Sequence, residues 1–276
     1  MHQLMKHIKA IAVFTAILAL LSGCAAQQNN FLYSTLWVQS SAEYKANCMQ
    51  IYNIAARNVD SALHDKGWTA AVEQRGDFSS LPPAVVIDID ETVLDNSPYQ
   101  AQLIIDGTGF DPRTWDEWIA MKRAPAVPGA VSFIKYLRGK NVAVFFITNR
   151  VCAPRAGNDC PCPQEQETID NLAGVGIDGV KPEHVLMQNE RPGWGSEKKS
   201  RREAITAGYR VLILIGDDLG DFLPDVKKNI TPLQRDELVR KYESCWGRTW
   251  YMLSNPAYGS WLRVLKDPKS SYLVGY

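Results

Sequence analysis

The sequence predicts an α/β protein built on a mainly parallel sheet. Short apolar, β-branched runs recur along the chain, and stretches with helical periodicity separate them. Strands that alternate with helices in this way are joined by right-handed crossovers in a parallel sheet. Three of the apolar runs lead directly into acidic or hydroxyl side chains, which such a sheet gathers at the carboxyl ends of its strands. We therefore expect one folded unit over 40–276, with a functional crevice at that edge.

The first of these runs reads VVIDIDETVL and extends from Val85 to Leu94. Its apolar start is typical of a strand that is buried on both faces. Asp88 and Asp90 then follow, with one residue between them. A buried carboxylate without a partner is costly, so a purely structural strand has no use for two. On this stretch alone, a turn or helix cap rich in Asp explains the pattern as well as a functional site does.

The other elements follow in order along the chain. A helix over 40–63 carries apolar residues at helical spacing and begins with Ser40 and Glu43, which fit a capping box. Asp111 and Pro112 begin a second helix, as its cap and first residue. The remaining predictions are helices over 128–138, 164–173 and 196–207, and strands over 142–147, 184–187, 211–215 and 249–253.

An inserted segment separates the first strand from the next α/β unit. Residues 95–127 are aromatic and helical in pattern. Trp115, Trp118 and Ile119 fall on one face of a helix, and packing is the ordinary explanation for such a stripe. Because the insertion directly follows the first strand, we expect a small helical cap over the crevice.

The N-terminus reads as a targeting segment. Lys6 and Lys9 precede an apolar stretch at 10–20, which is too short to span a membrane comfortably. The sequence LSGC, ending at Cys24, comes next and resembles the lipobox of bacterial lipoproteins. This resemblance implies a signal peptide over 1–23 and a lipid anchor on Cys24. An ordinary secretory signal, in which the cysteine is incidental, is the alternative.

The residues after the anchor extend this interpretation. Residues 24–39 are expected to form a polar tether. Ala25, rather than an aspartate, follows the cysteine, which by the same resemblance implies the outer membrane, with the protein facing the periplasm or the cell surface. The formal net charge is zero, which gives no indication of nucleic acid as a partner.

Export would place the remaining cysteines in an oxidising compartment. They are five in number, so at least one is unpaired in a monomer: Cys48, Cys152, Cys160, Cys162 and Cys245. The middle three lie in a segment rich in Pro and Gly, and we expect a disulfide from Cys152 to Cys160 or Cys162. A zinc site is the alternative, but no histidine lies near this segment and the spacing fits no common zinc module.

At the crevice the sequence places the groups that phosphoryl transfer uses. Asp88 and Asp217, from two strand ends, are oxygen ligands of the kind that Mg²⁺ prefers. One carboxylate can attack phosphorus while a second acid, such as Asp90, protonates the leaving alkoxide and then activates water. A hydroxyl such as that of Thr148, together with a lysine ammonium, can bind the phosphoryl oxygens, where negative charge must be stabilised.

These residues resemble the four signature motifs of the haloacid dehalogenase (HAD) superfamily. The motifs are, in chain order, Asp88-x-Asp90-x-Thr92, Thr148, Lys199 and Gly216-Asp217-Asp218-x-x-Asp221. Within the superfamily, the sequence at 88–99, the lipobox and the AVPGA sequence at 126–130 are similar to the class C acid phosphatases. The resemblance implies a Rossmann-like domain with a small cap and Mg²⁺ as cofactor. It also implies acid phosphatase activity on small phosphomonoesters, including nucleoside monophosphates as in a 5′-nucleotidase.

The resemblance also implies a role for each acid. Asp88 is the nucleophile, and it binds Mg²⁺ together with Asp217 and the backbone carbonyl of Asp90. Asp90 is the general acid and base, and the reaction passes through an aspartyl phosphate on Asp88. Asp221 holds a metal-bound water, and Asp218 lies beside it.

For the phosphate, the resemblance implies contacts from Thr148, Asn149 and one lysine. Lys198 and Lys199 are adjacent, so on a helix they point in different directions. We choose Lys199, because Lys199 and the residues after it resemble the Lys-Ser-x-Arg sequence of the family. The other lysine is expected on a solvated basic face.

Aromatic residues near the crevice are candidates for binding the leaving group. Family members hold a nucleotide base between aromatic side chains, and the candidates here are Trp118, Trp115 and Tyr258, of which Trp118 resembles the family position better. Stacking of this kind is worth about 1–3 kcal/mol per base. Packing in the core is the competing explanation for all three.

Two other functions remain open at this point. A phosphatase or phosphotransferase for sugar or lipid-head-group phosphates would share every catalytic residue. A surface lipoprotein that binds a ligand and keeps residual activity belongs to another class, and the complete set of acids argues against it.

Overall fold

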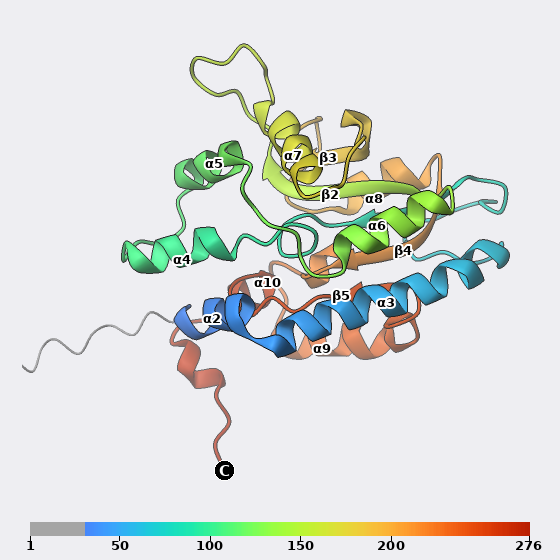
Figure 1. The fold of residues 1–276 in the computed structure, drawn as a ribbon. Helices are drawn as coiled ribbons and strands as arrows, with labels where there is room; N and C mark the ends of the chain where they lie inside the picture. The colour runs from blue at the N-terminus through green and yellow to red at the C-terminus, as the bar shows by residue number, and fades with distance from the viewer. Residues whose placement is uncertain (1–30) are drawn as a thin grey trace, which may run out of the picture.

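The computed structural model describes residues 31–276 of the chain (Figure 1). The signal peptide expected over 1–23, the lipid anchor expected on Cys24 and the first part of the tether lie outside the described residues. Within 31–276, no helix combines the length and the apolar character that crossing a bilayer would require.

A five-stranded parallel sheet forms the centre of the described chain, in the order β3-β2-β1-β4-β5. The strands are β1 (Pro83–Ile87), β2 (Ala143–Val151), β3 (Val185–Gln188), β4 (Arg210–Gly216) and β5 (Trp250–Met252). The order reverses between β1 and β4, and ligands of open α/β sheets bind outside the carboxyl ends at such a switch point. The predicted α/β fold with a parallel sheet is therefore confirmed.

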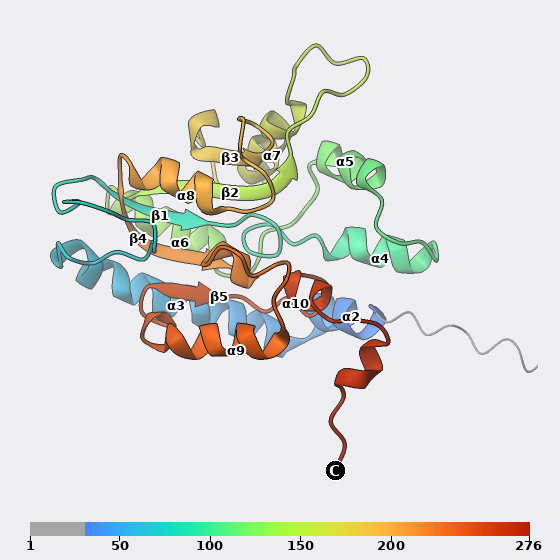
Figure 2. The ribbon, with the colours of Figure 1, turned by 180° about the vertical axis from the view of Figure 1, so that it is seen from behind.

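Helices cover both faces of this sheet (Figures 1 and 2). On one face lie α3 (Ala42–His64), α6 (Ala130–Gly139) and α7 (Pro163–Gly174); on the other lie α8 (Lys199–Thr206) and α9 (Pro232–Lys241). Side chains of β1 alternate between the two layers: Val85 and Ile87 pack in the α3 and α6 cluster, and Val86 packs in the α8 cluster. Burial on both faces explains why the strand is apolar at every position.

Two helices project beyond the carboxyl edge of the sheet (Figure 1). They are α4 (Ser97–Ile105) and α5 (Pro112–Met121), both within the expected insertion at 95–127. The side chain of Asp111 accepts a hydrogen bond from the backbone N–H of Arg113 at 2.7 Å, so α5 begins where the sequence predicts.

The segment before α3 differs from the sequence-based expectation. Residues 32–40 form a helix, α2 (Leu32–Ser40), where a polar tether was expected over 24–39. Ser41, and not Ser40, caps α3, because its hydroxyl accepts from the N–H of Tyr44 at 3.1 Å. Ser40 ends α2 instead, and its hydroxyl donates back to the carbonyl of Leu36 at 2.5 Å. The helix boundary therefore falls one residue later than the capping pattern indicates.

Several short elements complete the fold, and the sequence pattern predicts neither them nor α9. They are α10 (Ser260–Arg263) and the 3₁₀ turns η1 (Pro182–His184), η2 (Leu219–Asp221), η3 (Glu243–Cys245) and η4 (Lys269–Tyr272).

Cys152 and Cys162 form a disulfide with a Cα–Cα distance of 4.8 Å. The bond closes the loop between β2 and α7, as expected, and selects Cys162 over Cys160 as the partner of Cys152. Cys48, Cys160 and Cys245 are free. The zinc alternative is wrong for this segment, because the described residues offer a single group of potential metal ligands and it contains no cysteine.

Candidate active site

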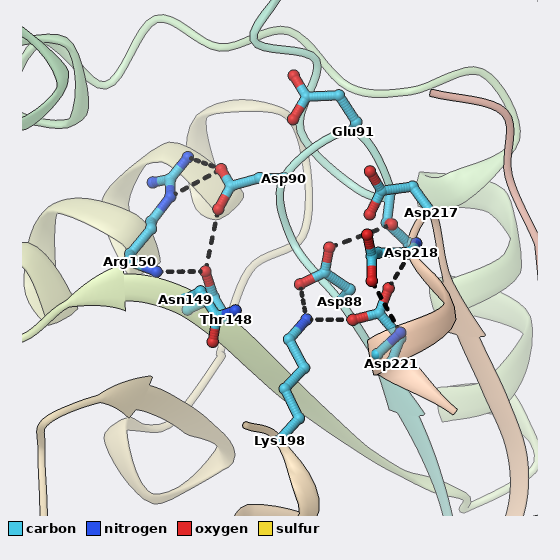
Figure 3. Close-up of polar contacts among 12 residues, drawn as sticks. Asp88, Asp90, Glu91, Thr148, Asn149, Arg150, Lys198, Asp217, Asp218 and Asp221 are labelled. Carbon is cyan, nitrogen blue, oxygen red and sulfur yellow. Dashed lines mark hydrogen bonds and ion pairs between the residues drawn. The ribbon is translucent and has the colours of Figure 1, made fainter. Parts of the chain in front are cut away.

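Three carboxylates converge where β1 and β4 end. Asp88 follows β1, Asp217 follows β4, and Asp221 belongs to the η2 turn just beyond. Each offers an oxygen that lies within 4.8 Å of the others, and Figure 3 shows the three side chains turned toward one another. Because the two strands are neighbours in register, the sheet itself brings these acids together.

Lys198 is the cation that this group contains. Its Nζ lies 2.6 Å from Asp221 Oδ1 and also pairs with Asp88 Oδ1, and the residue is only 4% exposed. Lys199 instead lies at the surface, 3.8 Å from Glu203. The choice of Lys199 is therefore wrong. The helix α8 begins at Lys199, so Lys198 occupies the preceding cap position and points inward while its neighbour points to solvent.

The turn after β4 depends on a residue without a side chain. A Cβ at Gly216 would lie 2.2 Å from Asp221 Oδ2, so only glycine allows the Asp221 carboxylate to lie over the strand end. The same Oδ2 accepts from the N–H of Asp218 at 2.9 Å. Asp218 points elsewhere and accepts from the hydroxyl of Ser260 at 2.7 Å, which joins this turn to α10.

Asp90 lies on the other side of Asp88 and turns away from the carboxylate group (Figure 3). Arg150 donates to its Oδ1 through Nε at 3.0 Å and Nη2 at 2.9 Å, and Thr148 donates to its Oδ2 at 3.0 Å. Asn96 adds a third donor at 2.9 Å. The side chain is therefore held in one orientation at the edge of the cavity, which it also lines.

Arg150, Asn96 and Glu91 contact site residues, although the sequence motifs assign them no role. Arg150 is 1% exposed despite its charge, and its only signal was its place two residues after Thr148. Glu91 is also buried, with a positive φ of 60°, and it accepts from the N–H of Asn96 at 3.0 Å and from the hydroxyl of Tyr258. The sequence indicated Glu91 only by its place beside Asp90, and a pattern at a strand end does not show which side chains turn back toward the site.

Two buried arginines of α8 fix the loops that carry the site. Arg201 donates to Asn149 Oδ1 at 2.7 Å and to the carbonyl of Thr148 at 2.5 Å. Arg202 donates to the carbonyl of Asp221 at 2.9 Å and forms a fully buried pair with Glu73 at 2.7 Å. The helix that follows Lys198, α8, therefore holds the carboxyl ends of β2 and β4 together.

The charges of this group perturb one another strongly. Burial raises the pKa of Asp88 from 3.8 to about 7; Lys198 opposes this shift, and Asp221 and Asp90 add to it. Burial, followed by the charges of Asp88 and Asp221, also raises the pKa of Asp217 well above its usual range. Burial would lower the pKa of Lys198, but the two aspartates beside it raise it. The single positive charge of Lys198 therefore offsets the negative charge of the three carboxylates only in part. A group of oxygen donors with excess negative charge fits a hard divalent cation.

A cavity of about 410 Å³ opens above these acids. Asp88, Asp90, Asp217 and Lys198 lie at its polar end together with Asn149. The rest of the lining comes largely from the insertion and the C-terminal segment, and it includes Leu103, Ile104, Phe110, Trp115, Tyr258 and Arg263. Catalytic candidates and a largely apolar wall therefore share one cavity.

The three aromatic residues proposed to bind the leaving group differ in whether they face the cavity. Trp115 and Tyr258 line the cavity, and Trp118 does not. The indole of Trp118 donates to Asn96 Oδ1 at 2.8 Å and packs beside the core. The preference for Trp118 as a stacking residue is therefore wrong: its neighbour three positions earlier on α5 faces the cavity. Thr148, expected to contact phosphate, is fully buried and is not among the residues that line the cavity; its hydroxyl donates to Asp90 Oδ2 at 3.0 Å.

Comparison with known proteins agrees with this arrangement. A family model described as HAD superfamily, subfamily IIIB (acid phosphatase), matches residues 2–261. Two solved structures of the class C acid phosphatase from Bacillus anthracis are similar in fold. One is 32% identical with a TM-score of 0.72. The other, with tungstate bound, is 31% identical with a TM-score of 0.74. Each comparison covers 89% of this chain and 97% of the other.

Curated plant proteins match over a shorter region. A protein named "Stem 31 kDa glycoprotein" from Glycine max is 27% identical over 142 residues, which is 51% of this chain. A protein named "Acid phosphatase 1" from Solanum lycopersicum is 26% identical over 143 residues, or 50% of the chain. The chain spans about half the length of these relatives, 52% and 51% respectively.

The raised pKa values predict how pH and a divalent cation act on stability. Between pH 5 and about 7 the metal-free folded state keeps a proton on Asp88 that the unfolded state has lost, so its stability falls as pH rises through this range. A cation binds the deprotonated carboxylates, so Mg²⁺ should raise the melting temperature more at pH 7.5 than at pH 5, by roughly 5 °C. Thermal unfolding of EDTA-treated protein, with and without added Mg²⁺, measures this difference. Asp217→Asn should remove most of it, and an equal Mg²⁺ effect at both pH values would contradict the prediction.

Proposed function

The chain belongs to subfamily IIIB of the HAD superfamily, the acid phosphatases, and from this premise we propose that it is a Mg²⁺-dependent acid phosphatase. Its substrates are small phosphomonoesters, including nucleoside monophosphates. One observation carries the proposal: the carboxylate of Asp88 lines the cavity, where it pairs with the buried Lys198 and lies beside two further acids. A nucleophile beside a cation and a metal-binding group is what phosphoryl transfer to a carboxylate requires.

In the first step, an oxygen of Asp88 forms a bond to phosphorus while the bond to the leaving oxygen breaks. Asp90 acts as the general acid and gives a proton to that leaving oxygen. In the second step, water attacks the aspartyl phosphate and Asp90 takes a proton from it, which releases inorganic phosphate and restores Asp88. The hydrogen bonds from Arg150, Thr148 and Asn96 support this role, because they hold the Asp90 side chain at the cavity.

Lys198 and the acids around it stabilise charge. The ammonium of Lys198 lies against Asp88, where it can bind an oxygen of the transferring group as negative charge moves onto it. Asp88, Asp217 and Asp221 would hold the cation. When bound, Mg²⁺ would neutralise the carboxylates and polarise the phosphoryl group. Asn149, at the same end of the cavity, is a further candidate for contact with phosphate.

The leaving group would occupy the wall formed by the insertion. Trp115 and Tyr258 both face the cavity, which supports a substrate with an aromatic base. The lipobox ending at Cys24 supports a lipid anchor and a place at the bacterial outer membrane. We propose both on these grounds.

Substitution of the nucleophile tests the central proposal. Asp88→Asn keeps the shape of the side chain but removes the attacking carboxylate, so activity toward 4-nitrophenyl phosphate should fall at least about 10³-fold. Activity should also disappear in EDTA and return with Mg²⁺. Asp225→Asn, on an exposed loop, is the control and should keep full activity. Turnover that survives Asp88→Asn would show that another residue attacks phosphorus.

The two adjacent lysines give a matched pair. Lys198→Met removes the ammonium beside Asp88, and kcat should fall by about 10²–10³-fold, as when a single group that stabilises developing charge is lost. Lys199→Met breaks only an exposed pair with Glu203, so kcat should change less than about twofold. Steady-state kinetics on both variants decide the matter, and the reverse order of effects would return the role to Lys199.

A substrate comparison separates nucleotides from sugar phosphates. Trp115→Ala should raise KM for a nucleoside monophosphate by about 5- to 100-fold, because a stacking contact with the base is lost. The KM for ribose 5-phosphate, which lacks the base, should stay unchanged, and Trp115→Phe should restore most of the nucleotide binding. If Trp115→Ala affects both substrates equally, or if the wild type prefers ribose 5-phosphate, a sugar phosphatase becomes the better assignment.

A further inference from the structure

The disulfide closes a loop that projects outward between β2 and α7 (Figures 1 and 2) and contacts the cap helix α5 through Arg155. Its first cysteine is fixed to the sheet, because the N–H of Cys152 donates to the carbonyl of Gln188 in β3 at 2.8 Å. Its second, Cys162, immediately precedes α7. The loop therefore starts and ends on rigid elements, and the bond between the cysteines limits how far the residues between them can move.

Arg155 extends from this loop to two helices. Its Nε and Nη2 donate to the two carboxylate oxygens of Asp116 on α5, at 2.8 and 2.9 Å. The same guanidinium pairs with Glu167 on α7, with Nη2 2.9 Å from Oε2. Gln164 supports the contact, because its side chain donates to Asp116 Oδ1 at 2.9 Å. The planar guanidinium meets both carboxylates with paired hydrogen bonds, which fixes direction as well as distance.

Asp116 is the residue after Trp115, so this contact holds the part of α5 that faces the cavity. The Trp115 ring packs edge-on against Tyr99, with centroids 5.2 Å apart. On another side it lies 5.9 Å from the guanidinium of Arg150, the residue that binds Asp90. A shift of α5 would therefore move the cavity wall that meets the leaving group, while the strand ends that carry Asp88 would stay in place.

We infer that Arg155 is a positioning residue: held in place by the Cys152–Cys162 disulfide, it sets the location of Trp115 and so the discrimination among leaving groups. The inference rests on the proposed phosphatase function for its kinetic consequence. We call the contacts of Arg155 with Asp116 and Glu167 the clamp. A large leaving group that reaches Trp115 depends on the clamp, and a small one that contacts only the polar end of the cavity does not. Opening the disulfide releases the same clamp from its other end.

Kinetics with two phosphomonoesters of different size test this inference. In Arg155→Ala and in the double variant Cys152→Ser/Cys162→Ser, KM for naphthyl phosphate should rise roughly 3- to 10-fold. For glycerol 3-phosphate, KM and kcat should stay within about twofold. Arg155→Lys should fall between Ala and wild type, because an ammonium cannot form both paired contacts.

Matched controls come from the same parts of the chain. Arg113→Ala breaks an exposed ion pair with Glu117 on the same helix, and Cys160→Ser removes the free thiol of the same loop. Both should resemble wild type with both substrates. Equal losses with the two substrates, or an Arg113→Ala variant that matches Arg155→Ala, would overturn the inference.

A measurement without substrate separates this inference from the proposed function. Amide hydrogen exchange over α5 should be faster in Arg155→Ala and in the disulfide variant than in wild type, and unchanged in Arg113→Ala. If the wild type hydrolyses neither ester, the proposed function fails, and faster exchange confined to α5 still supports the clamp. Unchanged exchange in both variants overturns the clamp whatever the activity.

Discussion

Repulsion among like charges is the constraint on which this structure depends. Asp88, Asp217 and Asp221 bring carboxylate oxygens within 4.8 Å of one another, largely out of water. Such a group is unstable unless cations offset it and rigid elements hold it. Lys198 supplies part of the positive charge that offsets the carboxylates, and the buried strands β1 and β4 supply the rigidity. The remaining negative charge would favour a divalent cation, which is why these acids are the candidate metal ligands.

The surrounding protein holds this group from two sides. On one side, the buried arginines of α8 bind the ends of β2 and β4 to one short helix, so the loops after these two strands cannot move apart. On the other side, the segment that contains α4 and α5 contributes a mainly apolar wall to the cavity. In the proposed function, the acids and Lys198 would serve the phosphoryl group, and the apolar wall would serve the leaving group. The disulfide loop between β2 and α7 is linked to this wall, since it contacts α5 through Arg155.

The sequence by itself determined the fold class and the acids of the site. Apolar strands that alternate with helices allow few arrangements other than a parallel sheet, and the carboxyl ends of neighbouring strands must meet at one edge. For that reason Asp88 and Asp217 could be brought together without coordinates. The cysteine-rich loop could likewise be closed by a disulfide from Cys152, because the candidate partners were only a few residues away. These predictions follow from spacing and chain direction alone.

Only the tertiary structure decided between neighbouring residues. Lys198 faces the acids and Lys199 does not, because the helix begins between them and adjacent positions point apart. Trp115 faces the cavity and Trp118 donates to Asn96, because the rotation of α5 is set by its contacts with other elements. The ion pair of Arg150 with Asp90 joins two residues that are 60 positions apart in the chain. Helix rotation and such distant pairings depend on packing of the whole chain, and no local pattern encodes them.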